Sequence, residues 1–181
     1  NCLTIGISQS GSGPDTAAFL ESLTDDTNHT LAITNTPGSL LTQKAEATLD
    51  LGCGKEESVA ATKSYTASLL ACYQLARAMG SALPDPKPLL PNLEWIELCE
   101  TRAHFGLPAI LRSTLFLSLG RGFEFATALE TALKLMECAL LPCKGYSTAD
   151  FEHGPKALAG PGSVAIVYSE TKSNLEDLGC F

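Results

Sequence analysis

Three charged residues in the second half of the chain, Glu130, Lys134 and Glu137, have a spacing that suits proton transfer. They stand at positions i, i+4 and i+7, which share one face of a helix. In a cleft, Lys134 could stabilise a developing enolate oxygen while Glu137 moves a proton between adjacent carbons. A salt-bridged surface face has the same spacing, and it is the simpler interpretation of this helix taken alone.

A histidine, His153, stands directly before a Gly154-Pro155 break. Neutral histidine can act as acid and base near neutral pH, and this is the chemistry that opens a sugar ring. The alternative is an ordinary histidine in a surface loop, which is the commoner case for a lone histidine.

A turn rich in small residues, Ser8-Gln9-Ser10-Gly11-Ser12, follows a short apolar run and precedes Pro14, which suits the first position of a helix. Such a turn exposes backbone N–H groups at the positive end of a helix dipole and can cradle a phosphate. The hydroxyls and amide of Ser8, Gln9, Ser10 and Ser12 add donors. No Gly-Lys-Ser/Thr and no GxGxxG follows, so it is neither a Walker loop nor a dinucleotide loop. A Ser-capped helix after a flexible turn is the alternative.

The elements that must position these residues alternate between strand and helix. Strands are predicted at 3–7, 30–34, 47–51, 113–119 and 163–168, and helices at 14–24, 39–45, 62–79, 93–104 and 123–140. Residues 52–58 are expected to form a charged loop. This alternation indicates βαβ units with parallel sheets. Four prolines mark residues 81–92 as a linker between two related α/β units.

Composition excludes several classes of protein. The formal net charge of -8 argues against binding to nucleic acid or to an anionic membrane. No apolar run is long enough to span a membrane. The seven cysteines are scattered, with no CxxC and no nearby histidine cluster, which argues against a zinc site or a disulfide framework and favours a reducing compartment. We therefore expect no metal and no cofactor.

Taken together, these segments resemble the sugar isomerase (SIS) domain family, in particular the isomerase part of glucosamine-6-phosphate synthases and the tandem-SIS glucosamine-6-phosphate deaminases. The matching segments are Ile7-Ser8-Gln9-Ser10-Gly11, Ile33-Thr34-Asn35 with Pro37-Gly38-Ser39, Ser58-Val59-Ala60-Ala61-Thr62-Lys63-Ser64-Tyr65-Thr66, Leu119-Gly120-Arg121-Gly122, Ala128-Leu129-Glu130 with Ala132-Leu133-Lys134-Leu135, Glu137, and His153-Gly154-Pro155. Each is weak alone, but their order and spacing match along nearly the whole chain.

The resemblance implies a three-layer parallel-sheet α/β fold with parts of two tandem SIS units. Residues 1–80 would be the C-terminal part of the first unit, and residues 93–181 the N-terminal part of the second, so we expect a fragment.

The resemblance also implies roles for single residues. Ser8, Gln9 and Ser10 would bind the sugar phosphate, backbone near Val59 and Ala61 would line the sugar site, Glu137 would be the base, Lys134 would support charge, and His153 would assist ring opening, in some members within a neighbouring subunit's site.

Several positions depart from the family pattern. Ser12-Gly13 stands where the synthases carry Glu-Thr, so one phosphate-binding hydroxyl is shifted or lost. Met136 replaces a frequent lysine, and Lys144 stands where an acidic residue is common. Residues 149–151 are closer to the deaminase and isomerase branch than to the synthases.

The leading expectation is a cytoplasmic, homodimeric enzyme that interconverts a ketose 6-phosphate and a 2-amino-aldose 6-phosphate. It would be an isomerase and deaminase, or a glutamine-dependent transaminase. The alternative is a non-catalytic module that senses phosphosugars in a regulator. Such a module needs the turn at Ser8 but not the pair of Glu137 and His153, so the presence of both favours the enzyme.

Overall fold

The computed structural model describes residues 2–23 and 27–169, and the chain divides into two compact units, 1–90 and 91–181. The first unit contains β1 (Cys2–Ile7), α1 (Pro14–Ser22), β2 (Asn28–Thr34), α2 (Leu40–Gln43), β3 (Ala47–Asp50), α3 (Lys63–Ala78) and η1 (Lys87–Leu89). The second contains α4 (Leu93–Leu111), β4 (Leu115–Gly120), α5 (Glu124–Ala139), β5 (Cys143–Ser147), α6 (Thr148–Glu152), η2 (Pro155–Leu158) and β6 (Ser163–Val167). The five predicted strands and five predicted helices are all confirmed.

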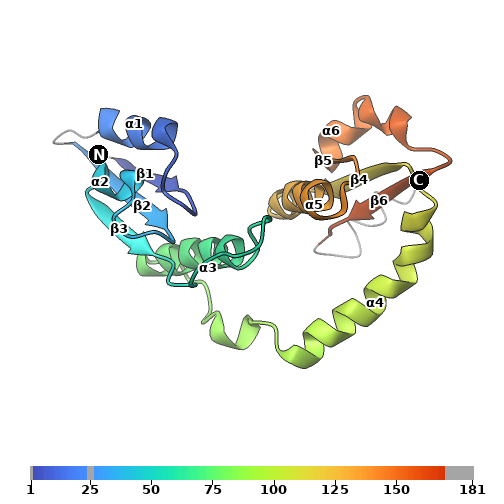
Figure 1. The fold of residues 1–181 in the computed structure, drawn as a ribbon, viewed down its shortest axis with the longest axis horizontal. Coiled ribbons are helices and arrows are strands. Elements are labelled where there is room, and N and C mark those ends of the chain that lie inside the picture. The colour runs from blue at the N-terminus through green and yellow to red at the C-terminus, as the bar shows by residue number, and fades with distance from the viewer. Residues whose placement is uncertain (1, 24–26, 170–181) are drawn as a thin grey trace. The chain divides into compact units, whose positions relative to one another are not determined.

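The sheet of the first unit is parallel, with strand order β1-β2-β3. Ala32 of β2 is fully buried against Ala17 and Leu20 of α1 and Leu41 of α2, so these helices cover one face. Ile33, which points to the other face, is also fully buried, and α3 lies against β2 there (Figure 1). The expected three-layer arrangement is confirmed in this unit.

The sheet of the second unit is also parallel, with β4 between β5 and β6. Phe116 packs with Ala132 of α5 on one face, while Leu117 and Leu119 pack with Phe151 of α6 on the other. Because neighbouring residues of a strand point to opposite faces, α5 and α6 lie on opposite sides of this sheet.

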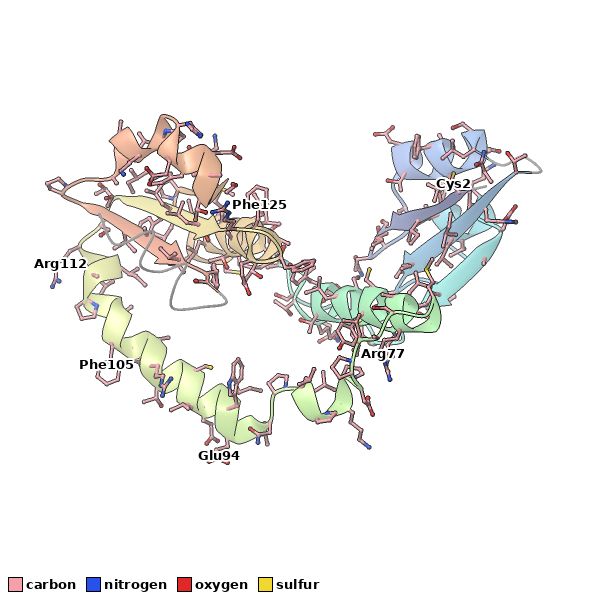
Figure 2. All side chains as sticks on the ribbon, turned by 180° about the vertical axis from the view of Figure 1, so that it is seen from behind. Cys2, Arg77, Glu94, Phe105, Arg112 and Phe125 are labelled. Atoms are coloured by element: carbon pink, nitrogen blue, oxygen red, sulfur yellow. The ribbon has the colours of Figure 1, made fainter. Side chains whose placement is uncertain are left out.

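Two segments of the second unit differ from expectation. The helix predicted to end at His104 continues as α4 to Leu111 with Pro108 inside it, although a proline there removes one intrahelical hydrogen bond. Among the described residues of α4 none is buried, and Figure 2 shows Glu94 and Phe105 projecting outward from it. The segment Cys143–Glu152, for which we predicted no element, forms β5 and α6.

Candidate functional site

The turn between β1 and α1 is fixed to the end of β2 through one carbonyl group. The Gln9 carbonyl oxygen accepts hydrogen bonds from the Thr34 hydroxyl at 3.2 Å and from the Asn35 N–H at 3.1 Å. The Thr36 hydroxyl donates to the same oxygen at 3.4 Å. Thr34 is fully buried, so this anchor lies in the core of the unit. The turn is therefore held in place at the carboxyl edge of the sheet, where open α/β sheets bind ligands.

Gly11 allows the turn to approach β2 and α2 closely. Its φ of 61° lies in the left-handed region, and an added Cβ would come within 2.6 Å of the Ser39 Cβ. Its carbonyl oxygen accepts a hydrogen bond from the Leu41 N–H at 2.9 Å. A side chain at this position would therefore be strained by both the backbone and the packing.

The serines of the turn differ in the hydrogen bonds that they already make. The Ser8 hydroxyl oxygen accepts from the Gly11 N–H at 3.2 Å, and that of Ser10 accepts from the Ser12 N–H at 3.3 Å. Both hydroxyls keep their own proton for a ligand. The Ser12 hydroxyl instead donates to the Ser10 carbonyl oxygen at 3.2 Å, so its proton is already used within the turn. Ser8 and Ser10 would thus be better donors to a bound ligand than Ser12.

An open pocket of about 530 Å³ lies at the carboxyl edge of the first sheet. Its polar lining residues are Gln9, Asn35, Thr36, Asp50, Lys55 and Glu56. Of the predicted substrate-binding residues, Gln9 is among the described residues that line this pocket, whereas Ser8, Ser10, Ser12, Val59 and Ala61 are not. Val59 is almost fully exposed, whereas its neighbour Ala60 is buried.

Glu56 lines the same pocket and was not among the residues predicted from the sequence. Its Oε2 accepts hydrogen bonds from the Thr62 N–H at 3.1 Å, the Ser64 N–H at 2.9 Å and the Ser64 hydroxyl at 2.7 Å. It thereby caps α3 and closes the loop that carries Val59 and Ala61. The Ser64 backbone and side-chain hydrogen bonds lower the pKa of the Glu56 carboxyl. The only signal in the sequence was a helix start at Thr62 preceded by acidic residues.

The predicted proton-transfer residues form a linked charged stripe on α5. Lys134 Nζ lies 2.8 Å from Glu137 Oε2 and 3.4 Å from Glu130 Oε1. The hydrogen bond to Glu137, followed by that to Glu130, raises the pKa of Lys134. Helical periodicity places the stripe on the side of α5 opposite Ala128 and Ala132, which face the sheet. The three side chains are 21–34% exposed, so the stripe is neither buried nor fully solvated.

His153 lies apart from this stripe within the chain. It follows α6 directly and is exposed, and its N–H donates to the Asp150 carbonyl oxygen at 3.2 Å. Since α6 and α5 cover opposite faces of the second sheet, His153 and Glu137 approach the sheet from different sides. The structure therefore brings Lys134 and Glu137 together but does not bring His153 to them within one chain.

A second pocket, of about 510 Å³, lies on the face covered by α6 and is lined by apolar residues such as Leu117 and Phe151. None of the predicted catalytic residues lines it. Within residues 2–23 and 27–169, no group of three or more His, Cys, Asp or Glu side chains could hold a metal ion. No helix in the same ranges combines the length and the apolar character needed to cross a bilayer.

Comparison with known proteins identifies relatives for both units. Residues 1–78 match the SIS domain family. The chain is 35% identical to glutamine–fructose-6-phosphate aminotransferase (isomerizing) of Thermococcus kodakarensis, over 97% of this chain and 32% of the relative. It is 36% identical to the enzyme of the same name from Methanothermobacter thermautotrophicus, over 97% of this chain and 31% of the relative. The chain thus spans about a third of the length of these relatives.

Solved structures show the same fold. The C-terminal domain of glucosamine-fructose-6-phosphate aminotransferase from Francisella tularensis has a TM-score of 0.69 at 25% identity, and the match covers 97% of this chain and 55% of that one. Glucosamine-6-phosphate deaminase from Thermotoga maritima has a TM-score of 0.73 at 24% identity, with 98% and 56% covered. The expected fold class is confirmed by these matches.

Proposed function

Residues 1–78 are an SIS domain, and the chain is homologous to the isomerase part of glutamine–fructose-6-phosphate aminotransferases. We therefore propose that the chain binds a hexose 6-phosphate and takes part in interconverting a ketose 6-phosphate and a 2-amino-aldose 6-phosphate. The observation that carries this proposal is the turn after β1. Ser8 and Ser10 each keep a hydroxyl proton, and the turn is anchored at the carboxyl edge of the sheet. This arrangement suits a phosphate.

In the proposed reaction, ammonia condenses with the C2 carbonyl of the open-chain ketose and water leaves. Glu137 then moves the proton of the resulting imine from C1 to C2, and the Lys134 ammonium stabilises the oxygen on which negative charge develops. The ion pair between them orients both groups. His153 assists ring opening as an acid and base. A sensing module would need neither Glu137 nor His153, so the presence of both favours proton transfer over the sensing role.

A homodimer is part of the proposal. Glu137 and His153 approach the second sheet from opposite sides, which favours a neighbouring copy as the source of the histidine for each site. A cytoplasmic location is also proposed, because the scattered, odd-numbered cysteines favour a reducing compartment.

The turn can be tested by titrating fructose 6-phosphate into the wild-type protein and into Ser10→Ala. Loss of one hydrogen bond to a charged oxygen should cost about 1.5–3 kcal/mol of binding free energy. Ser22→Ala is the matched control, because its hydroxyl donates to the Phe19 carbonyl oxygen at the other end of α1. Equal affinity of Ser10→Ala and wild type would contradict the proposal. Binding without any turnover in the complete protein would favour the sensing module.

A further inference from the structure

Lys55 belongs to the wall of the pocket at the carboxyl edge of the first sheet. Gln9, the second residue of the turn, lines the same pocket. A ligand that Gln9 contacts from within this pocket therefore lies in the space that Lys55 also borders.

The backbone on the N-terminal side of Lys55 is fixed by Asn35 at the end of β2. The Asn35 side-chain oxygen accepts from the Cys53 N–H at 3.1 Å, and its side-chain nitrogen donates to the Gly54 carbonyl oxygen at 2.6 Å. On the C-terminal side, Glu56 is fixed to the start of α3. Lys55 thus stands between two anchored neighbours, so its Cα is held at the pocket although its side chain is exposed.

The charges around the pocket leave Lys55 available to a ligand. Among the described lining residues it is the only cation, beside the carboxylates of Asp50 and Glu56. Asp50 Oδ1 accepts from the Gly52 N–H at 3.0 Å, and Glu56 Oε2 accepts from Thr62 and Ser64. The ion pairs found among the described residues do not include Lys55.

We propose that Lys55 is a specificity-determining residue whose ammonium contacts the phosphate of the sugar held by the turn. This proposal rests on the proposed function. The turn offers only neutral donors from Ser8, Gln9 and Ser10, and Gly13 brings no hydroxyl. A phosphate dianion is bound more strongly when a full positive charge joins such donors. Lys55 supplies that charge from the pocket that Gln9 also lines, and so selects phosphorylated over unphosphorylated sugars.

The test is isothermal titration of the protein with fructose 6-phosphate and, separately, with fructose. Lys55→Gln keeps the length of most of the side chain and removes the charge. Its Kd for fructose 6-phosphate should rise roughly threefold to tenfold, a range suited to a charge contact in an open pocket. The wild-type Kd should also rise more steeply with salt than that of Lys55→Gln. Lys87→Gln, an exposed lysine in η1 outside the pocket, is the matched control and should bind like wild type.

The outcomes separate this proposal from the proposed function. If Lys55→Gln binds like wild type while Ser10→Ala binds more weakly, the role of Lys55 is wrong and the turn is still the phosphate site. If neither variant loses affinity, or if wild type does not distinguish fructose 6-phosphate from fructose, both proposals are wrong.

Discussion

The ammonium of Lys134 and the carboxylate of Glu137 lie 2.8 Å apart on the outward face of α5. One turn earlier, Glu130 approaches the same ammonium at 3.4 Å. A single cation thus links two carboxylates with different proposed roles, since only Glu137 is proposed to take the substrate proton. Substitutions in this group can therefore separate chemistry from stability.

Replacing Glu137 by Gln should abolish isomerisation and leave phosphosugar binding nearly unchanged. The amide has the size of the carboxylate but cannot accept a proton, so the rate should fall by a factor on the order of 10²–10⁴. Exchange of solvent deuterium into C1 or C2 of the sugar phosphate reports on this step directly. Glu130→Gln is the control, because it weakens the same ion-pair group without removing the proposed base. Proton exchange at the wild-type rate in Glu137→Gln would show that another residue is the base and that the stripe is a salt-bridged surface.

The ion pairs of Lys134 should make stability depend on alkaline pH. Since the pKa of Lys134 is raised in the folded state above its ordinary value of 10.5, the stabilisation is complete below that value and is lost as pH rises through the folded-state pKa. Wild type should therefore melt at a higher temperature than Lys134→Gln at neutral pH, and the two should converge at strongly alkaline pH. An advantage that stays constant across this range would show that packing, not charge, is responsible.

Glu56 should stabilise the first unit in the opposite pH direction. Its pKa is lowered from 4.5, so its contribution is present above that value and is lost as pH falls through the folded-state pKa. Glu56→Gln should lower the melting temperature at neutral pH, with the difference from wild type shrinking in acid. It should also raise KM more than it lowers kcat, because it loosens the loop that carries Val59 and Ala61. The exposed neighbour Glu57 provides the control variant, Glu57→Gln, for which neither effect is expected.

Gly13→Thr should restore the hydroxyl that is missing at this position of the turn. Gly13 has φ -65° and ψ 114°, which any residue can adopt, and an added Cβ would meet only the Thr16 Oγ1 at 3.7 Å. Gly13→Thr should fold normally and tighten fructose 6-phosphate binding by about 0.5–1.5 kcal/mol, measured by titration. The contrasting variant is Gly11→Thr, which should destabilise the unit because of its positive φ and its contact with Ser39. Weaker binding by a folded Gly13→Thr would contradict the proposed place of the phosphate.

The alternating elements of the fold could be predicted because their signals are local. Ile5 and Ile33 lie in short apolar runs, and Pro14 marks a helix start. The strand Cys143–Ser147 carried no such signal, since it contains Lys144 and Gly145 and follows Pro142. Its conformation comes from pairing with β4, and Gly145 fits tightly there, since an added Cβ would meet the Leu129 Cα at 3.0 Å. Pairing between strands that are distant in the sequence cannot be predicted from the hydrophobic periodicity of either strand.

The candidate site was predictable to a similar extent. Lys134 and Glu137 are three residues apart in a predicted helix, which places their side chains next to each other. Their ion pair could therefore be predicted from the sequence. Glu56 escaped prediction because it caps α3 from a loop, and the distance along the chain to Ser64 has no standard value. The use of the Ser12 proton within the turn is likewise a matter of side-chain orientation, which residue type alone does not determine.

With α5 and α6 on opposite faces of the second sheet, the proposed homodimer predicts that two defective variants repair each other. In the proposed homodimer, each site would take Glu137 from one copy and His153 from the other. Co-expressed Glu137→Gln and His153→Asn chains would then form heterodimers in which one site is doubly defective and the other is entirely wild type. Recovery of activity in the co-expressed chains, when neither variant is active alone, would show that each site takes one of these two residues from each copy.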